Sequence, residues 1–377
     1  MTTKATLKDI AEAMGVTSTT VHRALKGKDG VSEKMRQTIR ELAAKMGYRS
    51  NYLASALKRK SIRIAIVLPE PVDDNKYYYG RMWRGVRDFL AEVSEFPIAP
   101  IERTYSFVYG ANGAALESLC QNHIGKLDGL ITMGVDQGQS LYFVEKFIER
   151  GVPIVYVGSD ISRGGRFCCV KSCDEMAGSL AAELLTAFHE DKTRRKVILL
   201  GHSGQLGMTD QIHNAAGFDA YIRENAPYLT LIQLRGAGHL EVCRELEQTL
   251  RSVEGVYAIY SCSARHTVYM LRVIEDLGMK GKLKLIGNDS FEESLNALER
   301  GELTAIIDKK IARQSYLAVK TLFDYIVKSE YPPSAQLQLK PEVILRSNLK
   351  KHFLSAVESP GNQLAHGEIL SPNFKVR

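Results

Sequence analysis

The segment from residue 6 to residue 26 constrains the fold of this 377-residue chain more than any other. Its pattern predicts two short amphipathic helices that meet at a glycine turn. Thr6, with Asp9 three residues later, matches a capping box at the start of the first helix. Gly15 can adopt the left-handed conformation that ends this helix, and Thr17 can cap the second. Two helices joined in this way form a helix-turn-helix, whose second helix enters the major groove of DNA.

The outward face of the second helix is polar and basic. An apolar stripe of Val21, Ala24 and Leu25 leaves the polar side chains on the opposite face. A third helix, capped by Ser32, is expected to complete a core that can fold on its own. The alternative interpretation is a generic three-helix bundle with a solvated polar face.

Charge favours the DNA-binding interpretation. Residues 1–61 carry a net charge of +8, whereas the whole chain carries +7, so residues 62–377 carry −1. A basic module on a near-neutral body is typical of nucleic-acid binding, because each neutralised phosphate releases counterions.

The remainder of the chain, 62–349, reads as α/β. Short apolar runs that end in Gly, Pro or polar residues alternate with helical stretches. The expected strands lie at 64–68, 129–132, 154–157, 197–200 and 285–287, and the expected helices at 82–93, 177–188, 215–224, 268–277 and 312–327. Such alternation predicts parallel sheets with helices on both faces, and the length predicts two lobes.

Five motifs resemble the start of the lactose-repressor (LacI) family of regulators. They are Thr-Leu-Lys-Asp-Ile-Ala at 6–11, Gly-Val-Thr at 15–17, Thr-Val-His-Arg-Ala-Leu at 20–25, Val-Ser at 31–32 and Gly-Tyr-Arg-Ser-Asn at 47–51. The resemblance covers residues 6–60 almost without gaps and extends more loosely to about residue 349.

The resemblance implies an all-α three-helix headpiece, a hinge helix and a two-lobed α/β core like that of periplasmic sugar-binding proteins. The implied boundaries are 1–49 for the headpiece, 50–61 for the hinge helix and linker, 62–349 for the core and 350–377 for a C-terminal tail. Within the core, lobe 1 is expected at about 62–159 and 291–322, and lobe 2 at about 160–290 and 323–349.

The hinge segment is too short to form a stable helix alone in water. Asn51 can cap it, and we expect it to fold only on DNA. By family position, Leu57 is a wedge that enters the minor groove and kinks the duplex. The alternative is that Leu57 packs on the core.

The residues expected at the DNA are Thr6, Lys8, Ser18, Thr19, Thr20, His22, Arg23, Lys26, Asn51 and Leu57. Arg23 is expected to read a guanine edge. Lys8, Thr20 and Lys26 are expected to contact phosphates. The family often has Ser where His22 stands, which predicts an atypical operator.

Ligands of open parallel sheets bind at the carboxyl ends of the strands. The candidates in such places are Asp73, Tyr77, Tyr79, Asp136, Asp289 and Asp308, and the resemblance adds Asn214 and Ser263. Many relatives have arginine at position 214 and asparagine at position 263. Because the guanidinium fork is missing there, we expect a neutral sugar or polyol. Each carboxylate could instead cap a loop or form an interlobe ion pair, and the tyrosines could pack a loop or a dimer surface.

Other chemistries find little support. The loop at 201–207 has the spacing G-x-x-G-x-x-G, which is not the dinucleotide fingerprint. Cys168, Cys169 and Cys173 lack a second matching pair, so we expect no metal, and no catalytic constellation or cofactor site stands out. No signal segment or apolar membrane span is visible, which predicts a cytoplasmic chain.

These patterns predict a regulator, not an enzyme. We expect a homodimer that binds palindromic double-stranded operator DNA, acts as a repressor and responds to a small molecule between the lobes. The tail has no apolar heptads, so a helical tetramerisation bundle is not expected. The alternatives are control by a corepressor or a partner protein, and a sugar- or nucleotide-processing enzyme with a basic appendage.

Overall fold

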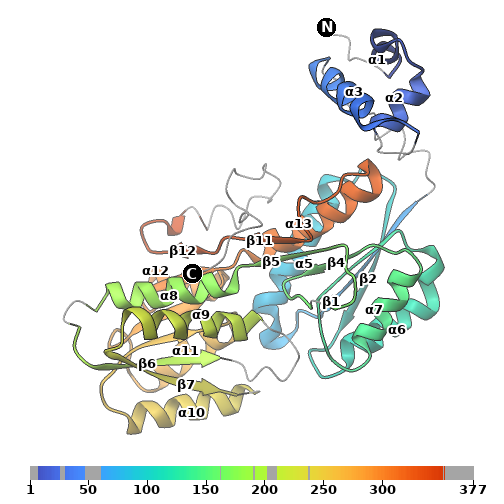
Figure 1. Cartoon of the computed structure of the whole chain (residues 1–377). Coiled ribbons are helices and arrows are strands. Elements are labelled where there is room, and N and C mark those ends of the chain that lie inside the picture. The colour runs from blue at the N-terminus through green and yellow to red at the C-terminus, as the bar shows by residue number, and fades with distance from the viewer. Residues whose placement is uncertain are drawn as a thin grey trace. The chain divides into compact units, whose positions relative to one another are not determined.

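A computed structural model describes residues 7–25, 30–46, 61–161, 163–189, 192–201, 210–236, 238–350 and 352 (Figure 1). The chain divides into two compact units, and the smaller of them holds the N-terminal helices. The predicted hinge at 50–60 and the tail beyond residue 352 lie outside the described residues, so their boundaries stay predictions.

The N-terminal unit contains the three predicted helices, α1 (Leu7–Met14), α2 (Ser18–Leu25) and α3 (Glu33–Lys45). Ile10, Val21 and Ile39, one from each helix, are fully buried in its core. Gly15 has φ +63°, as the turn requires. The Thr17 hydroxyl accepts a hydrogen bond from the backbone N–H of Thr20 at 3.1 Å, which confirms the cap of the second helix.

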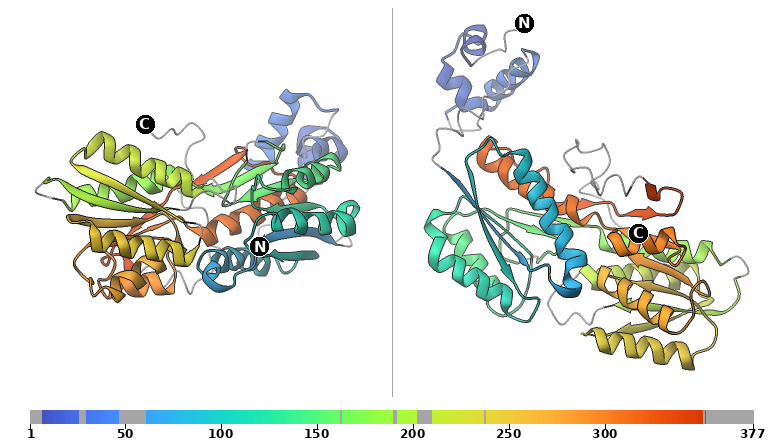
Figure 2. Two further views of the ribbon diagram at one scale, coloured as in Figure 1. Left: turned by 90° about the horizontal axis from the view of Figure 1, so that it is seen from below. Right: turned by 180° about the vertical axis from the view of Figure 1, so that it is seen from behind.

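The first lobe of the core is a six-stranded parallel sheet. Its strands in spatial order are β11 (Gln336–Leu339), β5 (Cys168–Ser172), β4 (Ile154–Val157), β3 (Gly129–Thr132), β1 (Ile62–Pro69) and β2 (Ile98–Tyr105). The helices α5 (Lys76–Glu92) and α13 (Ile311–Phe323) lie side by side on one face, and α6 (Ala111–His123) and α7 (Ser140–Glu149) cover the other (Figure 2). Short 3-10 turns, η1 (Asp73–Asn75) and η2 (Ile124–Lys126), precede α5 and follow α6.

The second lobe is also a six-stranded sheet. Its strands in spatial order are β12 (Glu342–Ile344), β10 (Ala305–Asp308), β9 (Lys284–Asn288), β8 (Val256–Ser261), β6 (Arg195–Gly201) and β7 (Leu229–Arg235). The helices α8 (Asp174–Ala187) and α9 (Asp210–Asn225) cover one face. The other face is covered by α10 (His239–Ser252), α11 (Ala264–Asp276) and α12 (Glu292–Glu299). A π-helical turn, η3 (Asp324–Lys328), follows α13 in the chain.

The apolar runs became strands because both faces of each sheet are covered. In β1, seven of the eight residues are buried, and β3 and β4 are buried throughout. Such strands read as continuous apolar runs and not as alternating ones. The five strands and five helices expected from the sequence are all present. One strand departs from the expected parallel order, because β12 pairs antiparallel with β10, with Ile344 opposite Ile306.

The lobe boundaries differ from those expected. Strands β5 and β11 were placed in lobe 2 but belong to the sheet of lobe 1, and α12 and β10 were placed in lobe 1 but belong to lobe 2. The chain crosses between the lobes after Ser172, after Asp308 and after Leu339. Strand patterns do not reveal these crossings, because each strand is buried equally well in either sheet.

Two pairs of helices pack with backbone against backbone. A Cβ atom added at Gly85 in α5 would lie 1.9 Å from the carbonyl oxygen of Ala312 in α13. A Cβ atom added at Gly178 in α8 would lie 1.9 Å from the carbonyl oxygen of Asn214 in α9. Each pair therefore leaves no room for a side chain between its helices.

We expect Gly85→Ala to lower the free energy of unfolding by about 1–3 kcal/mol, because α5 must move away from α13. Gly125→Ala is the control, since nothing lies within 4 Å of an added Cβ there. Urea unfolding of the two variants measures the difference. Equal midpoints for Gly85→Ala and Gly125→Ala would contradict the close packing.

Candidate functional site

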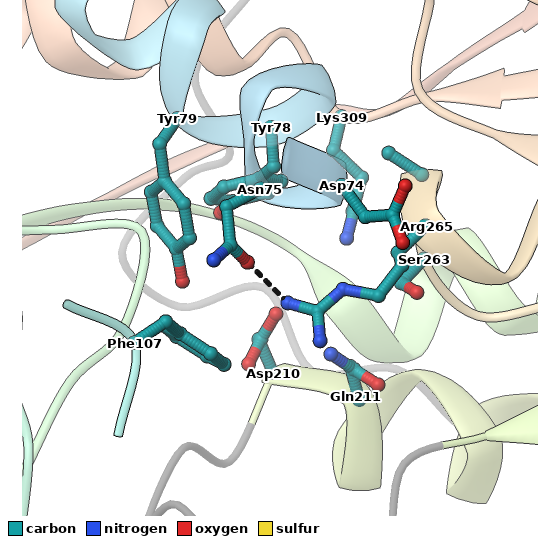
Figure 3. A pocket seen from close by; sticks show the side chains of 11 residues that line it. Asp74, Asn75, Tyr78, Tyr79, Phe107, Asp210, Gln211, Ser263, Arg265 and Lys309 are labelled. Atoms are coloured by element: carbon teal, nitrogen blue, oxygen red, sulfur yellow. Dashed lines mark hydrogen bonds between the residues drawn. The ribbon is translucent and has the colours of Figure 1, made fainter. Parts of the chain in front are cut away.

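The core contains a pocket at the carboxyl edges of its two sheets (Figure 3). From the first lobe it is lined by the end of η1, the start of α5 and the loop after β2. From the second lobe it is lined by the first residues of α9 and α11 and the segment after β10. The lining residues are Asp74, Asn75, Tyr78, Tyr79, Phe107, Asp210, Gln211, Ser263, Ala264, Arg265 and Lys309.

Arg265 brings a guanidinium group into this pocket. Its Nη2 donates a hydrogen bond to the amide oxygen of Asn75 at 2.5 Å, and its guanidinium carbon lies 5.2 Å from the ring centre of Phe107. The Phe107 ring in turn lies 5.4 Å from the ring of Tyr79. Together these side chains form a wall with two aromatic faces and a planar donor, which suits the C–H face and the hydroxyl groups of a sugar.

A buried group of charges lies beneath the wall. The ammonium of Lys309 is 3.7 Å from a carboxylate oxygen of Asp289, and these two side chains are 2% and 0% exposed. Lys171 pairs with Asp174 at 2.9 Å and is almost as deeply buried. Lys309 also lies 5.5 Å from the ring centre of Tyr78.

The buried charges shift the pKa values of their neighbours. Burial lowers the pKa of the Lys309 ammonium, but the negative charges of Asp289, Asp210 and Asp174 outweigh it and leave that pKa above its usual value. Burial raises the pKa of Asp289 to about 6, although Lys309 opposes the shift. The backbone N–H of Lys309 also opposes the upward shift of this pKa. Lys309 is therefore charged at neutral pH, and Asp289 ionises only near neutrality.

Two of the residues predicted from the sequence line the pocket. Tyr79 contributes to the aromatic wall, and Ser263 lies at the start of α11. The Ser263 hydroxyl also caps that helix, because it accepts a hydrogen bond from the backbone N–H of His266 at 3.3 Å.

Three of the predicted acids lie outside the lining of this pocket. Asp289 is sealed behind Lys309. Asp308 accepts a hydrogen bond from the backbone N–H of Lys310 at 3.1 Å and so caps its own loop. Asp136 pairs with Arg163 at 2.6 Å and is half exposed.

The other residues predicted to bind the ligand, Asp73, Tyr77 and Asn214, do not line this pocket either. Asp73 is exposed at the start of η1. Tyr77 packs against Phe291 of the second lobe, with ring centres 4.9 Å apart. Asn214 is fully buried and accepts a hydrogen bond from the Tyr260 hydroxyl at 2.6 Å. The face of α9 that carries Asn214 is held against α8 by the approach at Gly178, which keeps this side chain in the interior.

Sequence reasoning missed most of the lining residues. Asp74 and Tyr78 are direct neighbours of predicted residues, Asn75 lies two positions from Asp73, and Lys309 follows Asp308, so the strand-end rule found the right edge but the wrong side chains. Arg265 and Asp210 lie at the starts of helices, where polar residues are usually explained as caps. Phe107 stands in a loop without a strand-end acid, so no signal pointed to it.

The two lobes also touch beside the pocket. The Tyr269 hydroxyl of the second lobe donates a hydrogen bond to a carboxylate oxygen of Asp74 in the first lobe at 2.8 Å. Arg265 reaches Asn75 across the same boundary. An apolar cluster of Tyr77, Ala264, Val268 and Phe291 joins the lobes next to these bonds. A pocket occupant would therefore lie against the contacts that set the arrangement of the lobes.

The N-terminal unit presents the predicted DNA-reading face in part. Ser18, Thr19 and Arg23 of α2 are exposed, and Lys8 of α1 is exposed beside Glu12. Thr20 is half-buried, and its hydroxyl lies 2.9 Å from that of Thr17. Thr6, Lys26, Asn51, Leu57 and the side chain of His22 lie outside the described residues.

Among the described residues, no group of three His, Cys, Asp or Glu side chains is placed to hold a metal ion. The helices described in the structure include none with the length and apolarity needed to cross a membrane. In the glycine-containing loop at 201–207, residues 202–207 lie outside the described residues.

Two family models match this chain. The model for the periplasmic binding protein domain matches residues 64–330, and the model for bacterial regulatory proteins of the lacI family matches residues 6–51. The first therefore covers most of the core, and the second covers the helix-turn-helix and the residues that follow α3.

Two transcriptional regulators and one solved structure are also similar to this chain. The HTH-type transcriptional regulator GntR of Pseudomonas aeruginosa is 29% identical over 53% of this chain, and the match spans 54% of that protein. The ribose operon repressor of Lactococcus lactis is 24% identical over 77% of this chain and 82% of that protein. A crystal structure assigned to a LacI transcriptional regulator of Bacteroides fragilis superposes with a TM-score of 0.68 at 20% identity, covering 78% of this chain and 99% of that chain.

We expect Asp289→Asn to change how stability depends on pH. The folded state raises the pKa of Asp289 from 3.8 to about 6, so the native protein holds a proton that the unfolded chain has already released. Wild-type stability should therefore fall as pH rises from 4 to 6, by about 3 kcal/mol from this group. The variant lacks this carboxyl group and should lose the dependence that comes from it.

Urea unfolding at several pH values between 4 and 7 tests this expectation. Asp136→Asn is the control, because Asp136 is a half-exposed carboxylate at the surface. If the stability difference between wild type and Asp289→Asn is the same at pH 4 and pH 7, the folded state does not raise the pKa of Asp289, and the expectation is wrong.

Proposed function

The chain belongs to the lacI family of bacterial regulatory proteins, and on that premise we propose that it is a DNA-binding transcriptional repressor controlled by a small molecule in the core pocket. We propose further that it binds a palindromic operator as a homodimer in the cytoplasm and catalyses no reaction. The observation that carries the proposal is that a basic helix-turn-helix and a polar pocket between two lobes are joined in one chain.

The proposed effector is a neutral sugar or polyol. Arg265 and Lys309 bring positive charge to the pocket, and Asp74 and Asp210 bring an equal number of negative charges, so the lining as a whole is balanced. A balanced set of donors and acceptors beside aromatic faces suits hydroxyl groups better than a carboxylate or a phosphate. Arg265 supplies the guanidinium fork that position 214 lacks, so the absence of arginine at 214 no longer supports a neutral effector, and the proposal rests on the balanced charge of the lining.

The proposed switch uses the contacts between the lobes. An effector that touches η1 and α5 on one side and α9 and α11 on the other changes the free energy of the closed arrangement relative to the open one. It can change operator affinity only to the extent that it binds these two arrangements differently. The bonds from Tyr269 to Asp74 and from Arg265 to Asn75 are the contacts that the effector would reinforce or replace.

The proposed reading of DNA places α2 in the major groove. Arg23 is exposed on that helix and would bind a guanine edge, while Ser18 and Thr19 share its outward face. Lys8, at the start of α1, would contact a phosphate and fix the register of the headpiece.

Effector control is tested with the full-length protein and an operator selected from random DNA. A panel of pentoses, hexoses, hexitols, cyclitols and the corresponding sugar acids and sugar phosphates is screened by thermal shift. A neutral compound should raise the midpoint of unfolding and change operator affinity in a gel shift, because a cleft ligand stabilises the protein by mass action. Stabilisation by the acids or phosphates alone would contradict the neutral effector.

Arg23→Ala should flatten the base preference of the protein. Loss of one bidentate contact to guanine removes about 1–3 kcal/mol of discrimination. Lys8→Ala should instead weaken binding to all sequences and lower the salt dependence by about one counterion. Gel shifts on the selected operator and on single-base variants, at several salt concentrations, separate the two effects. An unchanged base preference in Arg23→Ala would show that α2 does not read the bases as proposed.

A further inference from the structure

Lys309 is the most deeply buried charged side chain in the lining of the pocket. It stands directly after β10, on a segment where the chain crosses between the lobes, and it is 2% exposed. Figure 3 shows its ammonium group directed into the pocket. Its contacts are an ion pair of 3.7 Å with Asp289 and the ring of Tyr78 at 5.5 Å.

The ammonium group of Lys309 has no hydrogen-bond acceptor among the described residues. It carries three N–H donors, and within the described part of the chain the structure gives it no hydrogen bond. A buried donor without an acceptor is costly, and a buried charge more so. The negative charges around it keep Lys309 ionised, so the pocket contains a charged donor that the described residues do not satisfy.

Asp210, in the same pocket, has an acceptor atom to which no described residue donates a hydrogen bond. It is 4% exposed, and its Oδ1 atom is buried without a hydrogen-bond donor in the part of the chain that the structure describes. Lys309 and Asp210 interact electrostatically but form no ion pair within 4.0 Å among the described residues. Among the described residues, the ammonium of Lys309 has no hydrogen-bond acceptor and the Oδ1 atom of Asp210 has no donor, and both residues line the same cavity.

A hydroxyl group satisfies both deficits at once, because it accepts a hydrogen bond through oxygen and donates one through its proton. We propose that Lys309 is a specificity-determining residue for the effector and that it holds, together with Asp210, one hydroxyl group of a neutral polyhydroxylated compound. The inference rests on the proposed function and deepens it by naming the residues that select the effector.

Charge explains why this hydroxyl belongs to a neutral compound. The positive charge of Lys309 is already opposed by Asp289, which lies behind it. An anionic group placed against Lys309 would also meet the buried carboxylate of Asp210. A hydroxyl group meets no such repulsion. An analogue that lacks it would leave two buried polar groups unpaired, and a site built to hydrogen-bond a hydroxyl rejects such analogues strongly.

Lys309→Met tests the proposal, because methionine keeps an unbranched side chain and removes the charged donor. The matched control is Lys171→Met, since Lys171 is as deeply buried and is paired with Asp174 but does not line the pocket. The probe is whichever neutral compound of the panel raises the midpoint of unfolding of the wild-type protein most. Isothermal titration of this compound measures its affinity for the full-length wild-type protein and for both variants.

We expect Lys309→Met to weaken binding of the probe by about 30-fold or more, as the loss of a buried charged hydrogen bond does. Lys171→Met should bind it within about threefold of wild type while unfolding at a lower temperature, because Asp174 loses its partner. Binding by Lys309→Met within threefold of wild type overturns the inference and leaves the proposed function intact. A panel in which no neutral compound stabilises the wild-type protein contradicts the proposed effector class and this inference with it.

Deoxy analogues of the probe test the same contact without a variant. One analogue should bind the wild-type protein about as weakly as Lys309→Met binds the probe, and the two losses should not add when combined. Removing a hydroxyl group weakens binding by some factor in the wild-type protein and by some factor in Lys309→Met. If these two factors are equal for every deoxy analogue, Lys309 holds none of the hydroxyl groups. If Lys309→Met does not show a cooperative unfolding transition, the wild-type protein decides alone: one deoxy analogue should bind it about 30-fold or more weakly than the probe, and binding of every deoxy analogue within threefold of the probe overturns the inference.

Discussion

Parallel strands that are covered by helices on both faces leave only their ends for polar chemistry. In each lobe of this protein the strand interiors are apolar and buried, so charged side chains gather at the carboxyl edges and at the starts of the helices that follow. Because the chain turns back at those edges to cross between the lobes, the edges of the two sheets come together. The position of the pocket, its mixed lining and the buried charges beneath it all follow from this constraint.

The buried charged side chains are stabilised by oppositely charged neighbours and not by water. Lys171 with Asp174 and Lys309 with Asp289 form two pairs beside the crossings of the chain, and Asp210 adds a third carboxylate. Pairs of this kind contribute little net stability, since the cost of removing charge from water offsets their attraction. Of these pairs only Lys309 with Asp289 reaches the pocket, because Lys309 lines it, so the retention of that pair is better explained by what Lys309 presents to a ligand than by what the pair adds to the fold.

How much the sequence predicted depended on the kind of signal. The helix-turn-helix, its glycine turn and the threonine cap follow from local rules of helix termination, and the strands follow from apolar runs. The lobe assignment of β5, β11 and β10 could not be obtained in this way, because a buried strand carries no mark of the sheet that it joins. In the pocket, the strand-end rule located the correct edge of the sheet but named Asp289 and Asp308, whereas the lining residue is Lys309. Which of two neighbouring side chains faces a cavity depends on the conformation of the turn, and the sequence pattern does not define that conformation. Tyr79 and Ser263 were found, whereas Asn214 was drawn inward by its bond to Tyr260.

The glycine contacts between helices have a mechanical consequence. With backbone against backbone at Gly85 and at Gly178, neither α5 with α13 nor α8 with α9 has an intervening side chain that could change rotamer and let the helices slide. A change in the arrangement of the lobes that left each of these helix pairs intact would fall on the three segments where the chain crosses between the lobes. Lys309 stands on one of these segments, so an occupant of the pocket that contacts Lys309 would act directly on a segment that joins the lobes.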